Sequence, residues 1–133
     1  MNVMVVGSGA REHAFVSKLS ESRRVNNIFT VPGNAGTTKL SKNLKLDISD
    51  FNTLFNSIKE HKIGLVIVGP EIPLINGLRD FLKSDKGLFD VLIVGPSSKG
   101  AMLEGSKDFS KEFMLRHNIP DLFIQNIYKY KSR

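Results

Sequence analysis

Short apolar runs that alternate with amphipathic segments are the feature that most restricts the fold of this chain. Strands made almost entirely of Val, Ile and Leu must bury both of their sides, which a parallel sheet covered by helices provides. The sequence therefore predicts an α/β fold, with a doubly wound, mostly parallel sheet in a three-layer αβα arrangement. The expected strands are residues 2–6, 27–31, 44–46, 65–68 and 91–94.

The expected helices are read from apolar residues at three- and four-residue spacing. The clearest is 50–61, where Phe51, Leu54, Phe55 and Ile58 form one stripe that Ser49 or Asp50 can cap. Residues 121–133 carry no clear periodicity, and we expect an irregular end there. The other expected helices are 11–20, one from near Pro73 with Leu74, Leu78, Phe81 and Leu82 on one face, 97–104, and one capped by Ser106 and ended by Pro120.

Composition narrows the class of protein. The chain has 133 residues, of which 41% are hydrophobic, and its four-residue apolar runs are far shorter than the roughly 20 residues that cross a bilayer. It has no cysteine and begins with a strand-like segment, so we expect one cytoplasmic domain without disulfides. The net charge of +6 is scattered rather than gathered in a stripe, which argues against nucleic acid as a partner, and the short apolar runs argue against a membrane.

Four loops follow the main strands, at 7–13, 32–36, 69–73 and 95–98. Each contains a glycine or a Pro-Gly or Gly-Pro step, which allows close approach of the backbone to a ligand. In open α/β sheets the ligand lies beyond the carboxyl ends of the strands. We therefore expect these loops to form one site.

The first of these loops, Gly7-Ser8-Gly9-Ala10-Arg11, opens a helix. The free N–H groups and dipole of a helix start suit a phosphate or carboxylate, and Arg11 adds donors. The dinucleotide fingerprint fails twice, because Glu12 stands at its third glycine and the second strand ends without an acid. A small phosphorylated molecule is the expected ligand. The alternative that the glycines serve only a tight turn, with no ligand, remains open.

Other polar residues in these loops each have two interpretations. Glu71 could accept hydrogen bonds from sugar hydroxyls or be a solvated loop acid. Asn34 could contact a ligand or only support its turn, and spacing alone favours the turn. His13 lies close to the first loop, but the three histidines are scattered without paired carboxylates, so no metal site is expected.

Four blocks in the same order resemble the N-terminal part of the phosphoribosylamine–glycine ligase family, also called glycinamide ribonucleotide synthetase, within the ATP-grasp superfamily. The resemblance runs from Met1 to about Pro120. It implies a Rossmann-like, substrate-binding pre-ATP-grasp domain at 1–104 and the start of a truncated ATP-grasp region at 105–133. The blocks are Gly7–Ala14, Pro32–Gly36, Val68–Leu74 and Leu103–Lys107.

The resemblance implies an ATP-dependent ligase of purine biosynthesis. With ATP and Mg²⁺, glycine becomes an acyl phosphate, and the amine of 5-phosphoribosylamine attacks it to give glycinamide ribonucleotide, ADP and phosphate. A monomer is expected. Lys107 matches the lysine that approaches the nucleotide phosphates, although a solvated helix lysine is the other interpretation. By position, the substrate-binding residues are Gly9, Ala10, Arg11, Glu12, His13, Pro32, Gly33, Asn34, Glu71 and Pro73.

Two departures from the family pattern matter. Ala10 stands where the family usually has glycine. The sequence also contains neither the ATP-grasp lid nor the magnesium carboxylates or the glycine site, so we expect no ligase activity from these 133 residues alone. The alternative function is a non-catalytic α/β module that binds a sugar phosphate or a nucleotide.

Overall fold

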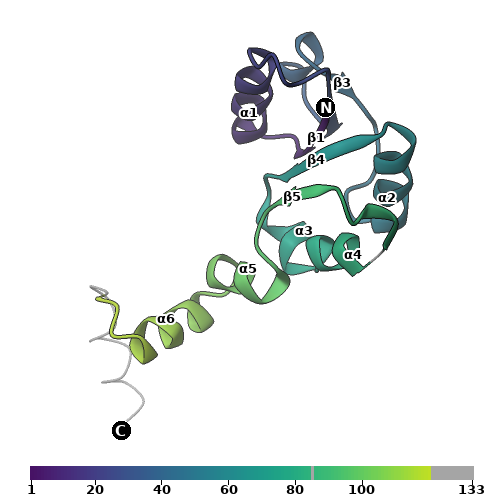
Figure 1. Ribbon diagram of the computed structural model, residues 1–133. Coiled ribbons are helices and arrows are strands. Elements are labelled where there is room, and N and C mark those ends of the chain that lie inside the picture. Colours follow the sequence, from purple (N-terminus) through teal and green to yellow (C-terminus); the bar gives the residue numbers. More distant parts are fainter. Residues whose placement is uncertain (85, 121–133) are drawn as a thin grey trace, which may run out of the picture.

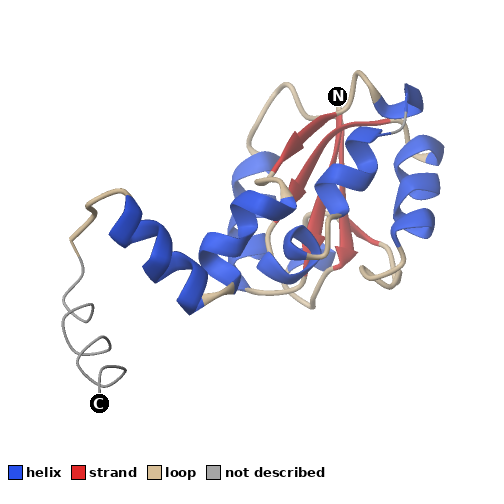
Figure 2. Ribbon diagram, turned by 90° about the horizontal axis from the view of Figure 1, so that it is seen from below, coloured by secondary structure: helices blue, strands red, loops and turns tan. Residues whose placement is uncertain are grey.

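The computed structural model describes residues 1–84 and 86–120, which form a five-stranded sheet with helices on both faces (Figures 1 and 2). All strand pairs are parallel, in the order β3-β2-β1-β4-β5. The strands are β1 (Asn2–Gly7), β2 (Asn27–Pro32), β3 (Lys42–Asn43), β4 (Ile63–Val68) and β5 (Leu92–Val94). The helices are α1 (Ala10–Ser20), α2 (Phe51–Glu60), α3 (Glu71–Ile75), α4 (Leu78–Ser84), α5 (Ser98–Gly105) and α6 (Lys107–Arg116), with 3₁₀ turns η1 (Thr37–Lys39) and η2 (Lys86–Leu88).

The two faces of the sheet are covered differently (Figure 1). On one face α1 packs through Val16 against Val3 and Val5 of β1 and their neighbours. The other face carries α2, α3 and α4, whose apolar side chains form a larger core with Met4 and Val6. This arrangement confirms the three-layer αβα prediction.

The start of α2 follows the predicted pattern. The helix buries its apolar stripe at Leu54 and Ile58, and Asp50 caps the N-terminus of the helix. The Asp50 carboxylate accepts hydrogen bonds from Thr53 N (3.0 Å) and Thr53 Oγ1 (2.6 Å). The Thr53 hydroxyl first, and then the Thr53 amide, hold the pKa of Asp50 below its usual value.

The expected strand at 44–46 is wrong, since β3 occupies Lys42–Asn43. Leu44 adds one bond to β2, from its N–H to Thr30 O (2.8 Å), but the next bond, from Leu46 N to Leu44 O (2.9 Å), turns the chain away from the sheet. Leu44 and Leu46 still pack against the core. The apolar alternation therefore predicted burial correctly and backbone pairing incorrectly.

The helix expected from near Pro73 is two helices. Gly77 has a φ of +91°, which an α-helix cannot contain, and it separates α3 from α4. Leu74, Leu78 and Leu82 are nonetheless all buried, as the stripe predicts.

After β5 the chain leaves the sheet through α5 and α6 (Figures 1 and 2). Ser97 and Ser106 cap these helices by accepting hydrogen bonds from Gly100 N (3.4 Å) and Phe109 N (3.3 Å). Helix α6 ends at Arg116 and buries none of its residues. The irregular end expected at 121–133 lies outside the described residues. Within the described ranges no helix is long and apolar enough to cross a membrane.

Candidate ligand site

A depression of about 420 Å³ opens at the carboxyl ends of β1 and β4. The strand order reverses between these two neighbours, since β2 and β3 lie on one side of β1 and β4 and β5 on the other. Such a switch point is where ligands bind in open α/β sheets. The depression is lined by Gly7, Ser8, Gly9, Ala10, Arg11, Glu12, Ile48, Pro70 and Glu71.

Arg11 and Glu12 connect the loops that frame this depression. The Arg11 guanidinium donates from Nη1 to Gly69 O (2.6 Å), which joins the loop after β1 to the loop after β4. Oε2 of Glu12 accepts the N–H of Gly9 (2.6 Å) at the N-cap of α1. This bond is half of a capping box, because the glycine has no side chain to return it. Both residues therefore line the depression and also bind backbone groups of the loops around it.

Glycine is required at two positions around Glu12, which is only 5% exposed. Gly7 has a φ of +127°, and a Cβ there would lie 2.6 Å from the Glu12 Cδ. A Cβ at Gly69 would overlap the Glu12 carboxylate oxygen. The buried carboxylate thus fills the space between the backbones that follow β1 and β4.

The second loop reaches the first through Asn34. Its Nδ2 donates to Ser8 O (2.8 Å), while its Oδ1 accepts Gly36 N (2.8 Å) and Thr37 N (3.0 Å). The turn interpretation of Asn34 therefore describes its observed bonds. Pro32, Gly33 and Asn34 are half-buried and do not line the depression.

The remaining predicted site residues lie in different places. His13 is exposed, with its ring against Gly36, and Pro73 is buried in α3. Lys107 is the exposed first residue of α6. The loop after β5 does not line the depression; instead Ser98 N donates to Asp80 Oδ2 (2.8 Å) of α4. Hydrogen bonds from the Ser98 side chain and then its amide lower the pKa of Asp80.

Sequence reasoning did not find Ile48 as part of the site. It lies between the depression at the switch point and an adjoining apolar one of about 280 Å³, lined also by Phe51, Ile72 and Pro73. Its position in the sequence, just before the cap of α2, could have indicated this place, because the chain must pass over the carboxyl edge of the sheet to start that helix.

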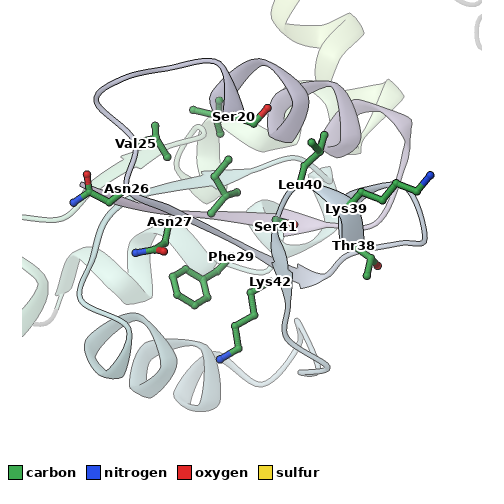
Figure 3. A pocket seen from close by; sticks show the side chains of 12 residues that line it. Ser20, Val25, Asn26, Asn27, Phe29, Thr38, Lys39, Leu40, Ser41 and Lys42 are labelled. Carbon is green, nitrogen blue, oxygen red and sulfur yellow. The ribbon is translucent and has the colours of Figure 1, made fainter.

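Another depression, of about 460 Å³, lies beside β2 and β3 (Figure 3). It is lined by Asn27 at the amino end of β2 and by the last residues of α1, opposite to the end where α/β sheets bind ligands. Lys39 and Lys42 border it but point in different directions, so they form no paired anion site (Figure 3). Its larger volume does not make it the better candidate.

Comparison with known proteins identifies the domain. The family model described as "Phosphoribosylglycinamide synthetase, N domain" matches residues 1–104. This chain belongs to that family. The match ends inside α5, so the N domain contains the whole sheet and the loops after β1 and β4 that frame the depression.

Relatives of this N domain are much longer proteins. A bifunctional purine biosynthetic protein of Pichia angusta is 43% identical over 99% of this chain, which covers 17% of the relative. The phosphoribosylamine–glycine ligase of Rhodopirellula baltica is 47% identical over 90% of this chain and 26% of the relative. The crystal structure of that ligase from Thermotoga maritima has a TM-score of 0.59 at 24% identity, covering 89% of this chain and 25% of the other, and supports the fold.

Proposed function

We propose that this chain is the part of a phosphoribosylamine–glycine ligase that holds 5-phosphoribosylamine. The ligase would join glycine to that amine with ATP, giving glycinamide ribonucleotide, ADP and phosphate. The observation that carries the proposal is a depression at the β1–β4 switch point of a phosphoribosylglycinamide synthetase N domain. Family membership favours this function over a non-catalytic module. A cytoplasmic location belongs to the same proposal, supported by the absence of cysteine.

The chemistry of the depression supports a sugar as the bound group. Glu71 lies on its wall, and its carboxylate accepts no hydrogen bond from the residues that the structure describes. A carboxylate with free lone pairs can accept bonds from two neighbouring hydroxyls. We assign Glu71 to the ribose hydroxyls, with Gly9, Ala10 and Arg11 as the backbone surface against which the sugar lies.

The other residues assigned from the family resemblance have different places in the proposal. Pro32, Gly33 and Asn34 would support the first loop from outside, because Asn34 holds Ser8 O. His13 would lie at the rim and Pro73 would pack beneath Glu71, two residues further along α3. Lys107 would act on ATP phosphates supplied by another part of the ligase.

ATP and Mg²⁺ are cofactors of the proposed whole reaction. Over residues 1–84 and 86–120 there is no group of three His, Cys, Asp or Glu side chains that could hold a metal ion. The proposal therefore assigns no step of glycine activation to these residues. Their task in the proposal is to bind and orient the amine substrate.

Titration calorimetry with ribose 5-phosphate and with glycinamide ribonucleotide tests the binding. We expect saturable heat with the wild type and at least a tenfold weaker affinity for Glu71→Gln, since an amide offers one acceptor where the carboxylate offers two. Glu60→Gln, at the exposed end of α2, is the matched control for loss of one negative charge. If neither compound gives binding heat at millimolar concentration, the proposal is contradicted.

A further inference from the structure

The buried carboxylate of Glu12 changes what the first loop can bind. Glu12 is 5% exposed, lines the depression, and accepts the Gly9 N–H at 2.6 Å. Gly9 N–H is one of the four amides that a helix start leaves free for an anion. The protein's own anion therefore already occupies part of the place where a phosphate would bind.

The charges on the wall of the depression also disfavour a phosphate there. Glu12 and Glu71 are carboxylates, and the one cation among the lining residues is Arg11, whose Nη1 is bonded to Gly69 O. Carboxylates accept hydrogen bonds and donate none, so they complement hydroxyl and amino groups. A phosphate group, which carries only acceptor oxygens and negative charge, meets two like charges there.

We propose that Glu12 determines specificity at this site: it makes the depression accept the hydroxyl and amine side of a phosphorylated sugar and directs the phosphate outward. The proposal rests on the proposed function and gives the bound substrate an orientation. It differs from the expectation, drawn from the glycine-rich turn alone, that the start of α1 holds the phosphate.

A purely structural Glu12 makes a different prediction. Gln at position 12 keeps an oxygen that can accept the Gly9 N–H, and it has nearly the same volume, but it removes the charge. If Glu12 only caps α1, the substitution leaves anion binding unchanged. If its charge excludes phosphate, Glu12→Gln strengthens phosphate binding at the same loop.

The test uses the full 133-residue chain labelled with ¹⁵N and titrated with inorganic phosphate at low ionic strength, followed by amide chemical shifts. We expect Glu12→Gln to bind phosphate about tenfold more tightly than the wild type, because one unit of like charge has been removed within a few ångströms. The responding amides should be Gly9, Ala10 and Arg11. Glu60→Gln should bind phosphate as the wild type does. Equal affinity of the wild type and Glu12→Gln overturns the proposal.

A second arm needs no variant and so does not depend on the folding of Glu12→Gln. In the wild type, inorganic phosphate should leave the amides of residues 9–11 unshifted at concentrations where ribose 5-phosphate shifts those of Ser8 and Glu71. Saturable phosphate shifts at 9–11 overturn the inference about Glu12. Failure of ribose 5-phosphate and glycinamide ribonucleotide to bind the wild type contradicts the proposed function instead, while the phosphate comparison still tests Glu12.

Discussion

The two faces of the sheet differ in how much apolar surface they bury. The face under α2, α3 and α4 has a continuous core, in which α2 buries Leu54, Ser57 and Ile58. On the opposite face α1 buries only Val16 and the carboxyl side chain of Glu12. A helix whose first turn lines the depression at the switch point has fewer positions left for packing. The multi-helix face is therefore expected to supply most of the stability and the α1 face most of the site.

The edge of the α1 face makes the contrast stronger. Leu92 and Val94 of β5 pair in register with Leu65 and Ile67 of β4, so they lie on the α1 side of the sheet. They are 58% and 53% exposed, whereas Ile93 between them packs against the other core. Burial along one strand thus alternates with the face, as period-two geometry requires.

The largest expected effect is at the centre of the multi-helix face. Leu54→Ala should lower the free energy of unfolding by about 3 kcal/mol, because it removes buried methyl groups and leaves a cavity at a 1% exposed site. Urea denaturation followed by circular dichroism measures the difference. A loss no larger than that of the α1-face variant below would break the proposed division.

A smaller loss is expected on the α1 face. Val16→Ala should cost about 1.5 kcal/mol, from two buried carbon groups at about 0.8 kcal/mol each. Because Val16 lies one turn after Glu12, the same variant should also weaken binding of ribose 5-phosphate. Leu54→Ala, measured under conditions where it is fully folded, should not. The two variants together compare stability and binding on the two faces.

Acid should weaken the multi-helix face through the cap of α2. The folded-state pKa of Asp50 is lowered from 3.8, so its stabilising effect is present above that value and is lost as pH falls through the lower, folded pKa. We expect the melting temperatures of wild type and Asp50→Asn to differ most near pH 6 and to converge below pH 3.8. A difference that stays constant down to the acid limit would show that the charge of Asp50 does not matter.

The smallest effect is expected at the uncovered edge of the α1 face. Leu92→Thr should change the free energy of unfolding by less than about 0.5 kcal/mol, because its side chain is largely in solvent and threonine suits a strand. Ile93→Thr, on the same strand but facing the other core, is the matched comparison and should cost more. Urea midpoints of the two variants sharpen the contrast between faces within a single strand.

The sequence predicted the fold well where apolar spacing is strict. The stripe of α2 and the Val-rich strands leave few other arrangements, and the Gly-Pro turn at 69–70 indicates where β4 ends. It predicted β3 poorly, because Leu44 and Leu46 alternate as strand residues do while their backbone hydrogen bonds turn back locally. Periodicity reports which side chains are buried, and it does not report which backbone groups pair.

For the candidate site, the sequence predicted the loops better than the roles of their residues. It placed Arg11, Glu12 and Glu71 together, and all three line the depression. It could not show that Arg11 binds Gly69 O, which is 58 residues away, or that Ile48 borders the site. Those contacts depend on how neighbouring strands bring distant loops together, which no local pattern records.

The contact between Glu12 and Gly69 also restricts how this domain can change in evolution. A methyl group at position 69 needs the space that the Glu12 carboxylate fills, so the two positions should vary together: a residue larger than glycine at 69 should accompany a shorter one at 12. In a double-mutant cycle, Gly69→Ala should be far less damaging in the Glu12→Ala background than in the wild type. Positions 12 and 69, which are 57 residues apart in the chain, would then be expected to co-vary among related sequences.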